Sequence, residues 1–239
     1  MNFGNLLSNM FPVIMFILFL SIFIISLSYS IISAKKRSER RHKVFEEIAL
    51  EIGAIYEKPL KFIDLTSFIF QGKSKELLNP NNIPRNTGFP VLELPLKGSK
   101  LRCTYHSSGG KNPIFYTDIF IEFEKPYEYK LRIYPEGFFS KIGKSLGMQD
   151  IEIGDPDFDG QYIIKCNNPD SAIQVVNSHF KQVFIAMCSF KYNNIDFTLE
   201  GHDATFQKTG LIEDKEELKQ YILMGKQIAE ILSPHRNLL

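Results

Sequence analysis

The chain has 239 residues, of which 44% are hydrophobic and 23% are charged, and its formal net charge at pH 7 is +1. That length is enough for one large domain or two small subdomains with a hydrophobic core. The charge argues against a nucleic-acid-binding protein, because the cations are concentrated near the N-terminus and leave a mildly acidic remainder.

The first predicted element is a membrane-spanning helix. No Asp, Glu, Lys, Arg or His occurs in residues 1–34, and the apolar stretch 11–33 is long enough, as a helix, to cross a hydrocarbon core of about 30 Å. A cleavable signal peptide is the alternative, but its charged n-region, short apolar core and A-x-A-like exit are missing. We expect the helix to begin near Phe11, with Pro12 in its first turn, and residues 1–10 to form a short extracytoplasmic N-terminus.

A cluster of cations follows the apolar stretch at once. It consists of Lys35, Lys36, Arg37, Arg40, Arg41 and Lys43. Because Lys and Arg are enriched on the cytoplasmic side of membrane helices, the cluster predicts a single-pass protein of a bacterial-type plasma (inner) membrane, N-terminus out and C-terminal domain in the cytoplasm. The same cations could also lie against anionic headgroups. A topology signal alone is the simpler interpretation.

Three serines, Ser26, Ser30 and Ser33, recur at helical spacing inside the apolar stretch. Small residues on one helix face allow two helices to approach closely, so this stripe could mediate a homodimer. Hydroxyls bonded to carbonyls of their own helix explain the spacing equally well.

The three cysteines, Cys103, Cys166 and Cys188, are scattered without C-x-x-C spacing. Their odd number in a domain of this size argues against a disulfide framework and fits a reducing compartment. The cysteines therefore agree with the topology that the cations predict.

Residues 34–54 are predicted to form a basic juxtamembrane segment and an amphipathic helix. Apolar residues recur at intervals of three and four between Glu39 and Ile52, and Gly53 ends the pattern. This helix could run continuously out of the membrane-spanning one.

Residues 55–239 are predicted to form a soluble α+β domain, with a break between two subdomains conceivable near 135–150. Apolar and polar residues alternate over 92–96 and 101–105, which predicts a hairpin with its turn at 97–100.

A second hairpin is predicted from residues 119–123 and 129–133, joined by a turn at 124–128 that contains Pro126. A polar loop, 106–113, lies between the two hairpins. It could cover a binding surface, although a simple connection is the default.

The rest of the chain alternates short helices and strands. We expect a helix near 138–146 closed by Gly147, strands near Ile151 and at 162–165, a helical stretch at 169–187, strands near Phe190 and at 195–200 and 204–208, and a last helix with Asp214 and Glu217 as its capping box. The predicted fold class is α+β: a single N-terminal transmembrane helix, then a mixed domain with mainly antiparallel sheet and helices on one side.

Two enzyme motifs are imitated near residues 143–147. Gly143-Lys144-Ser145-Leu146-Gly147 matches G-x-S-x-G, but a nucleophile elbow needs a turn from strand to helix, whereas this segment closes a helix. Its partners would come from Asp170, Asp196, His179 and His202, and nothing selects among them. A phosphate-binding loop is also excluded, because five residues separate Gly137 from Gly143 where the motif has four.

A calcium-type loop is imitated at residues 154–160. Asp155, Asp157 and Asp159 alternate before Gly160, as in the first half of such a loop. The twelfth position, where a bidentate Glu belongs, is Cys166. A turn in which Asp side chains bond the backbone explains the segment well.

The run from Lys144 to Ile151, continuing through Gly154-Asp155-Pro156-Asp157-Phe158-Asp159 to Tyr162 and residues 167–172, resembles a group of bacterial proteins. That group, often membrane-anchored and of unknown function, has an L-G-x-x-D-I segment before G-D-P-x-F-D-x-x-[FY] and a small helix. The resemblance implies a class without an assigned activity. It also implies that the middle Asp is not required in this segment.

The histidines predict no metal centre. His42, His106, His179, His202 and His235 have no partner at ligand spacing, so we expect surface or hydrogen-bonded side chains. We expect no cofactor.

Two hypotheses of function remain. The first is a non-enzymatic module, anchored in the membrane and facing the cytoplasm, that binds a protein or lipid partner through its aromatic-rich sheet. It depends on the predicted anchor and on the lack of clustered acid, base or nucleophile residues. The alternative is a membrane-tethered metal-dependent domain or enzyme centred on Asp155, Asp157 and Asp159.

Overall fold

The structure is a computed structural model that describes residues 3–57, 89–108, 112–136, 148–189 and 195–233, with side chains from residue 14 onward. The chain divides into two compact units, Met1–Lys43 and Val44–Leu239. The predicted helix at 138–146, the strand near Phe190 and most of the conceivable break at 135–150 lie outside the described residues.

A single helix, α1 (Phe3–Ile52), contains both the apolar stretch and the segment predicted to be amphipathic. Within the described residues it alone is long and apolar enough to cross a membrane, with a mean hydropathy of 2.5 and none of its apolar window buried. The expected start near Phe11 is wrong: the helix begins at Phe3, so Pro12 lies inside it. Helices in lipid tolerate an interior proline, because neighbouring groups satisfy the freed carbonyl.

The last turns of α1 belong to the folded domain. Phe45, Ile48 and Ala49 are buried, and the Phe45 ring lies 5.0 Å from that of Tyr105 at a steep angle. The helix ends at Gly53, whose φ of 70° is in the left-handed region that favours glycine.

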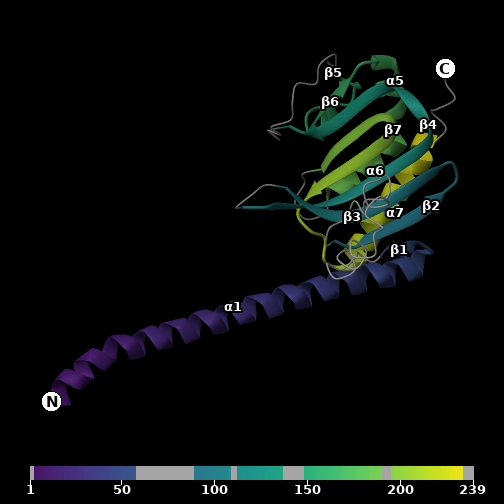
Figure 1. Cartoon of the computed structure of the whole chain (residues 1–239). Helices are drawn as coiled ribbons and strands as arrows, with labels where there is room; N and C mark the ends of the chain where they lie inside the picture. Colours follow the sequence, from purple (N-terminus) through teal and green to yellow (C-terminus); the bar gives the residue numbers. More distant parts are fainter. Residues whose placement is uncertain (1–2, 58–88, 109–111, 137–147, 190–194, 234–239) are drawn as a thin grey trace, which may run out of the picture. The chain divides into compact units, whose positions relative to one another are not determined.

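Seven strands form one antiparallel sheet in the order β1-β2-β3-β4-β6-β5, and β7 pairs with β4 outside this order (Figure 1). The strands are β1 (Ile55–Glu57), β2 (Val91–Leu96), β3 (Ser99–Ser108), β4 (Ile114–Pro135), β5 (Gln149–Ile151), β6 (Tyr162–Cys166) and β7 (Ile195–Thr209). β4 is the central strand, because it pairs in succession with β3 and β6 and along both regions with β7.

The hairpin of β2 and β3 is confirmed. Leu94 faces Leu101 and Leu92 faces Cys103 across the pair. The turn is shorter than predicted, since Ser99 already lies in β3 opposite Leu96. Gly98 has a φ of 73°, which a two-residue hairpin turn requires.

The second predicted hairpin is wrong, because residues 119–133 lie on one continuous strand, β4. The partner of this region is β7, a continuous strand across residues 201–203 where the sequence predicted an interruption. The register shifts between Glu122 and Tyr127 and again between Tyr127 and Leu131. The polar stretch around Pro126 is therefore an irregularity within a strand, where a residue without an N–H is tolerated.

Among the residues that the structure describes, four helices follow the central strand: α4 (Pro156–Asp159), α5 (Pro169–Val175), α6 (Ser178–Cys188) and α7 (Lys215–Leu232). The predicted helical stretch 169–187 is divided, because Asn177 begins a new helix by accepting from the N–H of Phe180. Asp214 caps α7 by accepting from the N–H of Glu217, as predicted.

The helices cover one face of the sheet (Figure 1). The Phe180 ring of α6 lies 5.5 Å from that of Phe197 on β7. On α7, a Cβ added at Gly225 would lie 2.8 Å from Ile119 Cδ1, so glycine permits a close approach of helix and sheet. The fold class is α+β, as predicted.

Candidate functional site: the outer face of the sheet

The sheet has an inner face, which packs against α7, and an outer face on the opposite side. Leu101 and Ile119 contact the Gly225 position on the inner face. Because side chains alternate along a strand, their neighbours point outward. The outer face, as used below, comprises Ile55, Glu93, Lys100, Arg102, His106, Tyr116, Asp118, Phe120 and Glu122.

One part of the outer face combines exposed apolar residues with ion pairs. Phe120 and Ile55 are 38% and 53% exposed. Arg102 and Glu93 lie between them, since Arg102 is opposite Phe120 and Glu93 is opposite Ile55, and Arg102 Nη2 is 3.4 Å from Glu93 Oε2. Lys100 Nζ lies 3.2 Å from Glu122 Oε2 and 3.7 Å from the same Glu93 oxygen. Protein interfaces commonly contain such a mixture of aromatic, aliphatic and charged groups.

The other part is a pair formed by His106 and Asp118. Nδ1 of His106 contacts Oδ2 of Asp118, whose side chain is 1% exposed. Oδ1 of Asp118 is buried, and no described residue forms a hydrogen bond with it. The half-exposed ring of His106 stacks on Tyr116 at a centroid distance of 4.6 Å and an angle of 10°.

Burial raises the pKa of Asp118 to about 6, against the opposing effect of His106. The carboxyl group therefore gains or loses its proton near neutral pH instead of near pH 4. With Nδ1 occupied, Nε2 is the nitrogen of His106 that a ligand could reach. Such pairs position a histidine for hydrogen bonding or proton transfer.

The sequence did not predict this pair. His106 was expected to be a surface or hydrogen-bonded histidine, which it is, but its partner was not identified. The strand register would have predicted the pair. His106 is opposite Tyr116, and Asp118 lies two residues further along the same face of β4. That register cannot be read without knowing that β3 pairs with the start of β4 across the polar loop.

The calcium-type segment forms the cap of a short helix. Asp155 caps α4 through the N–H of Phe158, and its Oδ2 lies 2.5 Å from Lys181 Nζ. The hydrogen bond from Lys181 is the main reason why the pKa of Asp155 is lower than usual. The carboxylate of Asp159 accepts hydrogen bonds from the backbone N–H groups of residues 153, 154 and 155, with N-to-O distances of 3.0 to 3.1 Å.

Among the described residues, no group of three or more His, Cys, Asp or Glu side chains is arranged to hold a metal ion. Asp157 is exposed, whereas the other two carboxylates already have partners. The geometry favours the turn interpretation of this segment, and the metal site at Asp155, Asp157 and Asp159 stays a prediction.

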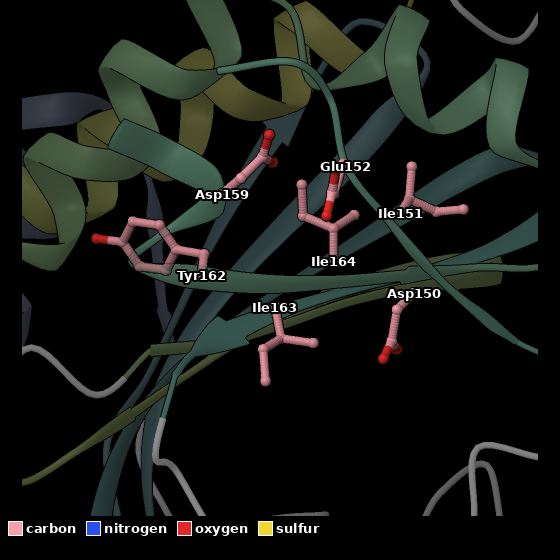
Figure 2. Close-up of a pocket in the computed structure, with 7 residues that line it drawn as sticks. All are labelled: Asp150, Ile151, Glu152, Asp159, Tyr162, Ile163 and Ile164. Carbon is pink, nitrogen blue, oxygen red and sulfur yellow. The ribbon is translucent and has the colours of Figure 1, made fainter. Parts of the chain in front are cut away.

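An open cavity of about 420 Å³ lies beside this segment and is lined by residues of the paired strands β5 and β6 and of the chain between them. Figure 2 shows Glu152 and Ile164 on one side of β6, whereas Asp150 and Ile163 point to the other side. Asp150 is engaged by Lys165, whose Nζ lies 2.9 Å from its Oδ1. The cavity lining is completed by Ile151, Asp159 and Tyr162.

Two of the candidate partners of the imitated hydrolase motif, Asp196 and His202, form hydrogen bonds elsewhere. Asp196 binds Arg132 through two hydrogen bonds of 2.9 and 2.6 Å. His202 Nδ1 donates to the carbonyl oxygen of Phe123 at 2.9 Å. Ser145 and the imitated phosphate loop lie outside the described residues.

The remaining predicted residues lie on α1 or in the core. Lys35 forms a 4.0 Å ion pair with Glu39 on α1. Ser21 Oγ donates to the carbonyl oxygen of Leu18, the kind of bond that was one explanation for the stripe of Ser26, Ser30 and Ser33. All three cysteines are buried and free.

Compared with models of protein families and with curated proteins, the sequence matches none. Among solved structures, the chain is similar to the crystal structure of the mycobacterial trehalose monomycolate transport factor A, TtfA. The TM-score is 0.48 at 10% sequence identity, over 80% of this chain and 94% of that chain. The similarity is one of backbone structure.

Proposed function

We propose that this protein is a single-pass membrane protein whose folded domain binds another protein through the outer face of its sheet. The observation that carries the proposal is a row of side chains across four strands, in which the exposed Ile55 and Phe120 lie on either side of the ion pair between Glu93 and Arg102. Exposed aromatic and aliphatic side chains beside charged groups are found in many binding surfaces. The exposed apolar window of α1 supports the anchor.

The orientation in this proposal is N-terminus out and folded domain in the cytoplasm. Two observations support it: the cations at 35–43 follow the apolar window directly, and the three cysteines are free. Both fit the cytoplasmic side of a bacterial-type plasma membrane.

Reporter fusions test the orientation. A reporter that is active only in the cytoplasm, fused after the last residue, should be active. The same fusion with an export-dependent reporter should be inactive. Activity of the exported reporter would overturn the orientation.

Site-specific crosslinking tests the binding surface. A photoreactive amino acid at Ile55 should give one reproducible crosslinked protein in cells. Phe120→Asp should reduce that product at least tenfold, because it replaces an exposed aromatic side chain of the outer face by a charged one. The control is Ile185→Asp, since Ile185 is 43% exposed on α6. An equal yield from both variants would overturn the proposal.

A further inference from the structure

The cation cluster on α1 contains three charges that no acidic side chain in the described part of the chain neutralises. Lys36, Arg37 and Arg40 are exposed and have no acidic partner among the described residues. The neighbouring Lys35 differs, because it forms an ion pair with Glu39.

Interactions within α1 do not stabilise these charges. α1 continues to Ile52, so the three cations are too far from its C-terminus to interact with the helix dipole. Lys36 and Arg40 are four residues apart on one face, as are Arg37 and Arg41, and like charges at this spacing repel each other. A counter-charge from outside the chain would remove that repulsion.

The position of the cations fits the headgroup layer of a membrane. The run of exposed large apolar side chains on α1 ends at Ile32. At about 1.5 Å per residue, Lys36 and Arg40 lie roughly 6 and 12 Å beyond it along the helix axis. Long basic side chains at the end of an apolar span extend their charges toward the polar layer.

We propose that Lys36, Arg37 and Arg40 bind the phosphates of anionic phospholipids next to the anchor. The inference rests on the proposed membrane span and adds a lipid preference to it. An Arg guanidinium can hold a phosphate through two hydrogen bonds, and the Lys ammonium adds a point charge. The binding site is formed by one helix and needs no part of the folded domain.

Quenching by brominated lipid tests this with the full chain. The protein has no Trp, so Ile32→Trp introduces a single probe near the cations. The protein is reconstituted in phosphatidylcholine vesicles with 30% phosphatidylglycerol, and either lipid is brominated in turn. We expect brominated phosphatidylglycerol to quench about threefold more strongly per mole than brominated phosphatidylcholine, and 0.5 M KCl to weaken this preference.

The variant Lys36→Gln/Arg37→Gln/Arg40→Gln should lose the preference. The control Lys97→Gln/Lys125→Gln/Lys226→Gln removes the same charge from the folded domain and should keep it. Equal quenching by both lipids in the parent protein, or an unchanged preference in the helix variant, would overturn the lipid inference alone. No quenching by either lipid would overturn the membrane span and the inference with it.

Discussion

Asp118 contacts His106 through one of its two carboxylate oxygens, and the other oxygen is buried without a hydrogen-bond partner in the described part of the chain. A buried, partly satisfied carboxylate lowers stability when it is ionised. Strongly shifted groups of this kind concentrate at functional sites. The pair is therefore the most informative target on the outer face.

Asp118→Asn should change how stability depends on pH. The pKa of Asp118 is raised from 3.8 to about 6 by burial, so the folded state binds the proton more tightly than the unfolded state. This contribution to stability is fully present below pH 4 and is lost as the pH rises through 6. Between pH 4 and 8, the free energy of unfolding of the variant should gain about 1 to 3 kcal/mol relative to the parent protein. Urea unfolding in non-ionic detergent measures it.

His106→Gln provides the control for that experiment. The imidazole lowers the pKa of Asp118, so without it the loss of stability should extend to higher pH. Identical pH profiles for His106→Gln and the parent protein would contradict the coupling between these two side chains.

Gly225→Ala should destabilise the protein although alanine favours helices. The added Cβ would lie 2.8 Å from Ile119 Cδ1 and 3.3 Å from Leu101 Cδ1. Overpacking of a core costs about 1 to 3 kcal/mol, against a gain of about 1 kcal/mol in helix propensity. We expect a net loss of about 1 kcal/mol in the free energy of unfolding. In an Ile119→Val background, which removes Cδ1, the loss should shrink by at least about 0.5 kcal/mol; strict additivity would contradict the close approach.

Asp159→Ala and Asp157→Ala should differ sharply in their effect on stability. Asp159 accepts three backbone N–H groups, and their loss should lower the free energy of unfolding by about 1 to 3 kcal/mol. Asp157 is exposed, so its replacement should change stability by about 0.5 kcal/mol at most. Thermal unfolding followed by circular dichroism compares the two. Equal losses would show that Asp157 has a partner of similar importance.

Calcium should not bind to this segment. Asp155 is held by Lys181, and Asp159 by the backbone, so a cation would have to displace both partners. Calorimetry of the full chain in detergent should give no heat of binding at millimolar calcium. Heat that disappears in Asp157→Ala would favour the metal site instead.

The fold could be predicted where apolar residues alternate regularly, as in Leu92, Leu94 and Leu101 of the first hairpin. The fold could not be predicted from the sequence where a strand is irregular. Glu124, Lys125 and Pro126 have the composition of a turn, yet they lie within β4, because β4 pairs with β7 on both sides of them, at Glu122 and at Tyr127. Tertiary pairing overrides local composition in such strands.

The candidate site was harder to predict than the fold. Phe120 looks like any strand residue until its strand is placed beside Arg102. Asp118 becomes unusual only when burial is known, because its sequence neighbours are those of an ordinary alternating strand. The acidic segment at 155–159 was conspicuous in the sequence for the opposite reason: its carboxylates are close in sequence, but they serve the turn.

The irregular pairing of β4 and β7 also bears on solubility. Within the described residues β7 pairs with β4 alone, and a long, flat, unpaired strand edge is a template for aggregation. The stretch of β4 from Glu122 to Leu131 pairs with a shorter stretch of β7, from Asp203 to Leu199. Gly201, in the middle of that shorter stretch, has a φ of 58°. The register shifts and the left-handed Gly201 interrupt the regular course of β7 near its middle, so we expect its edge to be a poorer template for edge-to-edge association than a regular strand of the same length.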